Sequence, residues 1–171
     1  MTQALMAGIV SLVASTVWLH VGSSDIIAGH AIPKVFMARQ CGGENRSPSL
    51  AWSGAPHGTA SFAIVMHDAD APIAGGFYHW VLYNLSSRTH GLEPDVKVAG
   101  DQLGQTSAGR TEYHGPCPPP GPAHHYTITV YALDLSRVSA PTPLTGPELE
   151  RSIDGHVLAR GVLEATAATN P

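Results

Sequence analysis

The stretch Tyr126–Leu133 (YTITVYAL) indicates the fold class of this 171-residue chain most clearly. Its side chains alternate, so that Tyr126, Ile128 and Val130 share one face of an extended chain, while threonine and tyrosine occupy the other. β-Branched and aromatic residues favour strands, and two faces of unequal polarity are typical of an antiparallel sheet. The stretch therefore predicts a strand of an antiparallel sheet.

Two further runs have the same character, namely Ser61–His67 (SFAIVMH) and Tyr78–Leu85 (YHWVLYNL). Each is rich in apolar strand formers and is bounded by loops that carry glycine or proline. The chain holds 18 glycines and 14 prolines without a repeat period, which predicts many turns. These runs favour an all-β protein over a parallel α/β fold.

One helical pattern stands near the carboxyl end. It begins at Gly146 and Pro147, where proline suits a first helical turn, and Gly155 weakens or divides it. The residues at helical spacing are Leu149, Ile153, His156, Val157 and Arg160. We therefore expect a mainly all-β fold, a two-sheet antiparallel β-sandwich with a short C-terminal helix.

The length favours a single domain, and we place it at residues 18–171. Residues 1–17 are predicted to be a signal peptide or an N-terminal extension. No charged residue precedes Asp25, and Ala4–Ala14 (ALMAGIVSLVA) is an apolar run of signal-peptide length that lacks a preceding Lys or Arg. We expect an exported protein rather than a cytoplasmic one. Polar residues interrupt the segment that a membrane-spanning helix would need.

Charge excludes one class of function. Nine Lys and Arg residues face thirteen Asp and Glu residues, the formal net charge is −4, and no basic run occurs. A protein that neutralises the phosphates of nucleic acid needs a basic stripe. Nucleic-acid binding is therefore not expected.

Residues able to do chemistry gather at three places. His67-Asp68-Ala69-Asp70-Ala71-Pro72 follows the first apolar run, and His79 lies at the start of the next. The third place is Tyr113–Gly121 (YHGPCPPPG), a loop stiffened by proline, followed by His124-His125-Tyr126. Because strand side chains alternate, His124 and Tyr126 share one face and His125 points to the other.

On these motifs the chain resembles the phosphatidylethanolamine-binding protein family, also called the Raf kinase inhibitor protein family, in its bacterial branch. The other matching stretches are Ser47–Trp52, Phe77–Trp80 and, more weakly, Ile153–Ala159. The resemblance implies a two-sheet β-sandwich with a small pocket for anions such as phosphate or a phospholipid headgroup. The pocket residues that it implies are Asp68, Asp70, Pro72, His79, Gly115, Pro118, His124 and Tyr126.

The chemistry of these residues fits an anion pocket if the aspartates stabilise the protonated, positively charged form of the histidines. Imidazole N–H groups and the Tyr126 hydroxyl can donate hydrogen bonds, and a carboxylate that accepts from His79 or His124 favours the imidazolium. Only modest affinity is expected, because no predicted pocket residue is Arg or Lys. No cofactor is expected.

Several alternatives stay open. Asp68 and Asp70 also fit turn-capping residues. A metal site is disfavoured, because His67, Asp68, Asp70, His79 and His124 lack metal-binding motif spacing. The expected function is a binding or regulatory protein rather than an enzyme. Its alternatives are a protease or kinase inhibitor that acts on a protein target, and an enzyme that uses the Asp/His pocket for acid–base chemistry. Peripheral membrane contact and a homodimer are further candidate interactions.

The two cysteines, Cys41 and Cys117, both lie in stretches that the resemblance covers. We expect their loops to lie near one rim, so that a disulfide between them is a candidate in an oxidising compartment. The alternative is two buried free thiols.

Overall fold

Strands dominate the computed structural model, which describes residues 19–140 and 143–169. The strands are β1 (His20–Gly22), β2 (Leu50–Ser53), β3 (Ser61–Asp68), β4 (Phe77–Ser86), β5 (Gly91–Leu92), β6 (His124–Leu133) and β7 (Val157–Ala167). The helices are the short 3-10 helices η1 (Lys34–Phe36), η2 (Arg39–Cys41) and η3 (Gly100–Gln102), and the α-helix α1 (Gly146–Ser152). The predicted mainly all-β architecture is confirmed.

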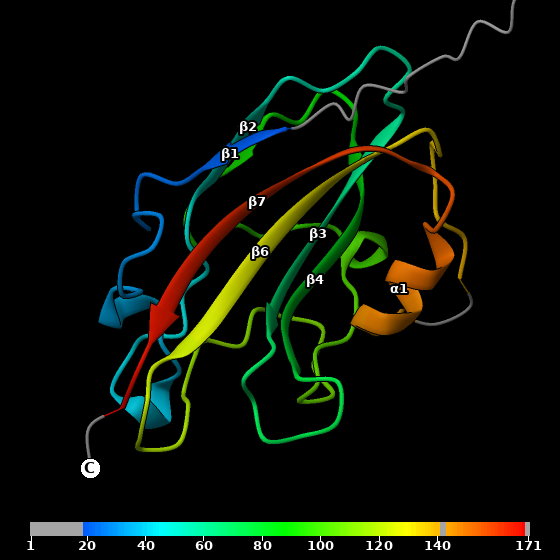
Figure 1. Ribbon diagram of the computed structural model, residues 1–171. Coiled ribbons are helices and arrows are strands. Elements are labelled where there is room, and N and C mark those ends of the chain that lie inside the picture. The colour runs from blue at the N-terminus through cyan, green and yellow to red at the C-terminus, as the bar shows by residue number, and fades with distance from the viewer. Residues whose placement is uncertain (1–18, 141–142, 170–171) are drawn as a thin grey trace, which may run out of the picture.

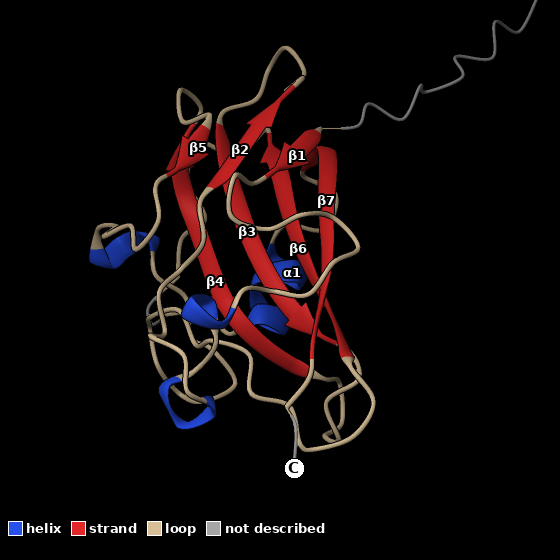
Figure 2. Ribbon diagram, turned by 90° about the vertical axis from the view of Figure 1, so that its left-hand side faces the viewer, coloured by secondary structure: helices blue, strands red, loops and turns tan. Residues whose placement is uncertain are grey.

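The strands form two sheets that pack against each other. The larger sheet has the order β4-β3-β6-β7 and the smaller one the order β1-β2-β5, and each strand pair is antiparallel. Figure 1 shows the four long strands side by side, and Figure 2 shows the small sheet lying over the upper part of the large one. The lower end of the large sheet is left to loops, and the chemistry-bearing motifs lie there.

The two faces of β6 differ as its alternation predicts. Tyr126, Ile128 and Val130 are at most 1 % exposed and belong to the core between the sheets. The opposite face contacts a second apolar cluster, which includes Leu149 of α1 and Ile153 directly after it. β3 lies between both cores, so its side chains from Ser61 to Met66 are all buried, which explains its continuous apolar run.

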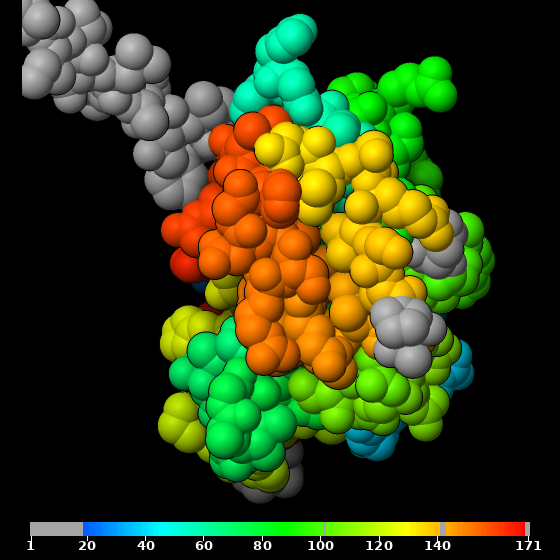
Figure 3. All heavy atoms as spheres, turned by 90° about the vertical axis from the view of Figure 1, so that its right-hand side faces the viewer, coloured from blue at the N-terminus to red at the C-terminus, as the bar shows by residue number. Residues whose placement is uncertain are grey.

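Helix α1 covers the outer face of the large sheet. Its N-terminus carries a capping box in which the Glu148 carboxylate accepts from the Thr145 backbone N–H (2.9 Å) and hydroxyl (2.7 Å). Glu150 accepts from the hydroxyls of Tyr78 (2.8 Å) and Tyr131 (3.0 Å) on the sheet below. Figure 3 shows α1 and the segment before it as one surface over this face.

The helical spacing beyond Ile153 was misleading. The helix ends at Ser152, Gly155 adopts a left-handed φ of 80°, and Val157 begins the longest strand of the large sheet. Along β7 buried and exposed residues alternate, and its core side carries small residues such as Gly161, where a Cβ would lie 2.4 Å from the Leu19 carbonyl oxygen. Val157 and Arg160 therefore belong to strand β7, and Ile153 and His156 also lie outside the helix.

The signal peptide or extension predicted for residues 1–17 lies outside the described residues. Within residues 19–140 and 143–169, no helix is long and apolar enough to cross a membrane.

Candidate functional site

Three neighbouring strands bring the predicted site residues together at the lower end of the large sheet. Asp68 is the last residue of the central strand β3, and its cross-strand partners are Tyr126 on β6 and Phe77 on β4. His79 lies two residues after Phe77, and His124 two residues before Tyr126. Since side chains alternate along a strand, these residues present one face to the same point.

His124 and Asp68 form an ion pair or hydrogen bond inside the site, which we call the inner pair. The His124 Nδ1 donates to Asp68 Oδ2 at 2.8 Å, and the side chains are only 14 % and 4 % exposed. The second Asp68 oxygen accepts from the backbone N–H of Asp70 at 3.0 Å. Both carboxylate oxygens are therefore engaged, and His124 Nε2 has no hydrogen-bond partner among the described residues.

His79 is buried and is held by backbone rather than by an aspartate. Its Nδ1 lies 2.6 Å from the carbonyl oxygen of His114, so Nδ1 must carry the proton and donate, while the His114 N–H donates to the His79 carbonyl (2.9 Å). Burial lowers the pKa of His79 to about 4, although the His114 carbonyl opposes this shift. The expected imidazolium is therefore wrong for His79, which is neutral at pH 7 and leaves Nε2 as an acceptor.

Tyr126 places a buried hydroxyl in the site. The residue is 1 % exposed, and this hydroxyl makes no hydrogen bond of good geometry with any residue in the described part of the chain. Burial, followed by the nearby Asp68 carboxylate, raises its pKa, so it stays protonated and can donate. Its nearest acceptor is the Asp68 carboxylate, whose two oxygens already accept from His124 and from the Asp70 N–H, so the hydroxyl meets it only with poor geometry. A ligand that offers a well-placed acceptor would therefore be favoured.

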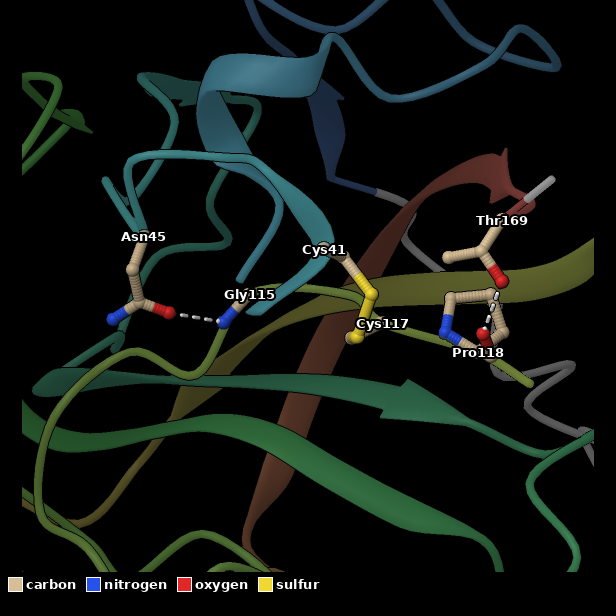
Figure 4. Close-up of a disulfide and its surroundings, with 6 residues drawn as sticks. All are labelled: Cys41, Asn45, Gly115, Cys117, Pro118 and Thr169. Atoms are coloured by element: carbon tan, nitrogen blue, oxygen red, sulfur yellow. Dashed lines mark hydrogen bonds between the residues drawn. A yellow bond between two sulfur atoms is a disulfide. The ribbon is translucent and has the colours of Figure 1, made fainter. Parts of the chain in front are cut away.

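The wall opposite the strands is the proline-rich loop, fixed to the segment that follows η1. The Ala38 N–H donates to the Pro116 carbonyl (3.0 Å), and Asn45 Oδ1 accepts from the Gly115 N–H (2.8 Å). Gly115 is required there, because a Cβ would lie 2.5 Å from the backbone of Met37 and Ala38. Figure 4 shows the hydrogen bond between Asn45 and Gly115 beside the disulfide.

Cys41 and Cys117 are joined by a disulfide with Cα atoms 5.6 Å apart, and their loops share one rim as expected. On the other side of the bridge, the Thr169 hydroxyl donates to the Pro118 carbonyl at 2.6 Å. The wall of the site is therefore tied covalently to η2 and by a hydrogen bond to the end of the chain.

These elements enclose a cavity of about 160 Å³. The predicted residues that line it are Asp68, Pro72, His79, Pro118, His124 and Tyr126. Gly115 does not line it, because it packs behind the wall against Ala38. Asp70 does not line it either, since it lies past the end of β3 on the outside, where its carboxylate accepts from the backbone N–H (2.8 Å) and Nδ1 (2.7 Å) of His125.

The cavity has further lining residues that were not predicted: Gln40, Ala71, Ile73, Phe77, His114, Cys117 and Pro119. His114, Cys117 and Pro119 lie in the quoted proline-rich loop and Phe77 directly precedes the His79 motif, so the sequence held a signal for them. Gln40 comes from a distant segment that the disulfide brings close, and no sequence pattern marks it. Within the described ranges, no group of three or more His, Cys, Asp or Glu side chains has an arrangement that could hold a metal ion.

The polar groups of the cavity are of mixed character. The Tyr126 hydroxyl donates, the neutral His79 accepts at Nε2, and His124 donates at Nε2 whenever it is protonated. The prolines of the wall have no backbone N–H to offer. Such a site suits a small group that both donates and accepts hydrogen bonds.

Comparison with known proteins agrees with this architecture. A family model described as phosphatidylethanolamine-binding protein matches residues 22–168. A UPF0098 protein of Aquifex aeolicus is 37% identical over 147 residues, which are 83% of this chain and 84% of the relative. A Mycobacterium tuberculosis protein whose name contains the words "lipoprotein LppC" is 34% identical over 136 residues, covering 79% of this chain and 65% of that protein.

A solved structure has the same fold. The crystal structure of Escherichia coli YbcL, described as a member of the mammalian PEBP family, superposes with a TM-score of 0.83 at 28% identity. The match covers 89% of this chain and 99% of YbcL. With the family model matching nearly the whole described chain, we conclude that this protein belongs to the phosphatidylethanolamine-binding protein family.

Proposed function

We propose that this chain is a ligand-binding protein whose cavity takes a phosphate group in its monoanionic, singly protonated form. The observation that carries the proposal is the Tyr126 hydroxyl, which is buried without a well-formed hydrogen bond beside the Asp68–His124 pair. A phosphate oxygen would accept from this hydroxyl and relieve the cost of burying it.

A phosphate monoanion offers both a donor and acceptors to the polar groups of the cavity. Its P–OH donates to His79 Nε2, which is a bare acceptor because Nδ1 is committed to the His114 carbonyl. Its charged oxygens accept from the Tyr126 hydroxyl and from Nε2 of His124, whose Nδ1 donates to Asp68 on the other side. A phosphodiester has no P–OH, so a free phosphate or a phosphomonoester fits better than an intact phospholipid headgroup.

The affinity should be modest. No Arg or Lys lines the cavity within the described chain, and the imidazole of His124 that would face the ligand is already paired with a carboxylate. We expect dissociation constants nearer the millimolar than the nanomolar end of the range, which corresponds to roughly 4–6 kcal/mol of binding free energy.

Isothermal titration calorimetry at about pH 6.5 tests the proposal with matched ligands. Inorganic phosphate and O-phosphoethanolamine should bind about tenfold more tightly than sulfate and glycerophosphoethanolamine, because the latter two lack the proton for His79. Tyr126→Phe should weaken phosphate binding about tenfold without loss of thermal stability, since the variant removes an unsatisfied buried hydroxyl. Equal affinity for all four ligands, or wild-type affinity in Tyr126→Phe, would contradict the proposal.

We also propose that the protein acts outside the cytoplasm. The Cys41–Cys117 disulfide supports this, because such bonds persist in oxidising compartments, and the lipoprotein name of one relative points the same way. Thiol alkylation and mass analysis of the protein from its own host should find no free cysteine. Two alkylated cysteines would reject the location.

A further inference from the structure

A second, open cavity adjoins the phosphate pocket. It has a volume of about 520 Å³ and shares the lining residues Gln40 and His114 with the pocket. We call it the basic groove, because four cationic residues line it: Arg39, Arg46, Lys97 and Arg110. They are four of the nine Lys and Arg residues in a chain of net charge −4, so cationic side chains gather beside the pocket.

Three carboxylates also line the groove, and each pairs with a cation two residues away. The pairs are Arg46–Glu44 (3.9 Å), Lys97–Asp95 (3.0 Å) and Arg110–Glu112 (3.3 Å). All of these side chains are 45–84 % exposed, and ion pairs at such positions contribute little and exchange partners readily. An incoming anion can therefore recruit these cations without a large loss of stability.

Arg39 differs from the other three cations. Its guanidinium has no hydrogen bond and no ion pair with any residue of the described ranges, and its side chain is exposed on η2. Gln40, which follows it, lines both cavities, and Cys41 anchors η2 to the pocket wall through the disulfide. The one groove cation without a carboxylate thus lies on the element that is fixed to the pocket.

His114 links the electrostatics of the two cavities. Its side chain is half-buried between them, and its carbonyl holds His79 in the neutral tautomer. Burial and, next, the charge of Arg110 lower the pKa of His114, while Glu112 opposes this shift. Charged groups of the groove therefore act on a residue of the pocket wall.

We propose that the basic groove binds a second anionic group of the same ligand, and that the ligand is a small molecule carrying a phosphate and a further phosphate or carboxylate. The inference rests on the proposed phosphate pocket and adds to it. The phosphate enters the pocket, and the second anion lies beyond Gln40 and His114, where Arg39 binds it.

A series of linear phosphates of increasing length tests the inference by calorimetry at about pH 6.5 without metal ions. Affinity should rise from phosphate to pyrophosphate to tripolyphosphate by about fivefold or more in total. Arg39→Gln should remove most of this rise and leave the affinity for phosphate unchanged. The control Arg88→Gln removes the same charge beyond the opposite end of β4 and should keep the rise. Tyr126→Phe should weaken all three ligands by a similar factor.

The outcomes separate the two proposals. Equal affinity along the series, or equal losses in Arg39→Gln and Arg88→Gln, would overturn the basic groove while leaving the pocket intact. Tight binding of tripolyphosphate that Tyr126→Phe does not weaken would also overturn the inference, because the ligand would then bypass the pocket. Absence of binding by all three ligands would overturn the phosphate pocket itself, and the groove inference with it.

Discussion

Two histidine–aspartate pairs lie on opposite faces of β6, formed by adjacent histidines, and their geometry is nearly the same. Nδ1 of His124 is 2.8 Å from Asp68, and Nδ1 of His125 is 2.7 Å from Asp70. The inner pair is 14 % and 4 % exposed, whereas the outer pair is 75 % and 46 % exposed. Hydrogen-bond length therefore does not distinguish a site from a surface contact, but burial does.

The surroundings of the inner pair explain why burial matters. It shares its cavity with the neutral His79 and the buried Tyr126 hydroxyl, and the proline-rich loop forms the wall that faces these groups. Inside such a site polar groups interact more strongly with one another than they would at the surface. The outer pair has the surrounding water as its alternative partner. His125 lowers the pKa of Asp70 through its hydrogen bonds, and neither residue lines the cavity.

Removing the disulfide, which fixes the wall of the inner site, should have the largest effect on the unfolding free energy. Closing a loop of 76 residues restricts the unfolded chain, and the double variant Cys41→Ala/Cys117→Ala should lose roughly 4–5 kcal/mol of unfolding free energy. Urea denaturation with and without dithiothreitol measures the loss. Reductant should destabilise the wild type and leave the double variant unchanged. A loss below about 1 kcal/mol would show that the wall holds without the bridge.

Acid should destabilise the inner region through His79. An unfolded histidine takes up a proton near pH 6.5, but folded His79 does so only near pH 4, so its contribution is fully present above pH 6.5 and is lost as the pH falls toward 4. The loss should be on the order of 3 kcal/mol. His79→Gln should flatten the pH dependence of unfolding, whereas the outer-face control His125→Gln should keep it. An equal slope in the wild type and His79→Gln would refute the assignment.

Removing one carboxylate from each pair compares them directly. Asp68→Asn should lower the unfolding free energy by about 2 kcal/mol, because a buried charged hydrogen bond to His124 is weakened. Asp70→Asn should produce no measurable change, since solvent replaces the lost interaction. Thermal and urea unfolding of the two variants side by side suffice. If Asp70→Asn were the more destabilising, burial would not be what separates the pairs.

From the sequence it could be predicted that the residues of the inner site meet, but the charge state of His79 could not. Strand patterns around Asp68, His79 and Tyr126 indicated neighbouring antiparallel strands, and the alternation of His124 and His125 was read correctly from spacing alone. The neutrality of His79 depends on a wall formed by residues 113–119, far along the chain, and no local pattern reports such burial.

Two other differences have local causes. Asp70 was placed in the pocket beside Asp68 because the family resemblance implies it, but β3 ends at Asp68 and the turn carries Asp70 outward. Val157 and Arg160 fit a helical spacing by coincidence. The left-handed Gly155 ends the helical segment, and the small residues facing Leu19 select the strand.

The central claim is that the inner pocket binds a phosphate group together with a proton, and proton uptake tests it most directly. At about pH 8 a phosphomonoester, whose second pKa is about 6, is mainly a dianion in solution. Calorimetric titration of O-phosphoethanolamine in two buffers of different ionisation enthalpy gives the number of protons taken up on binding. We predict an uptake of at least about one proton per ligand, namely the P–OH proton that the phosphate donates to His79 Nε2. Binding of the ester without proton uptake would contradict the account.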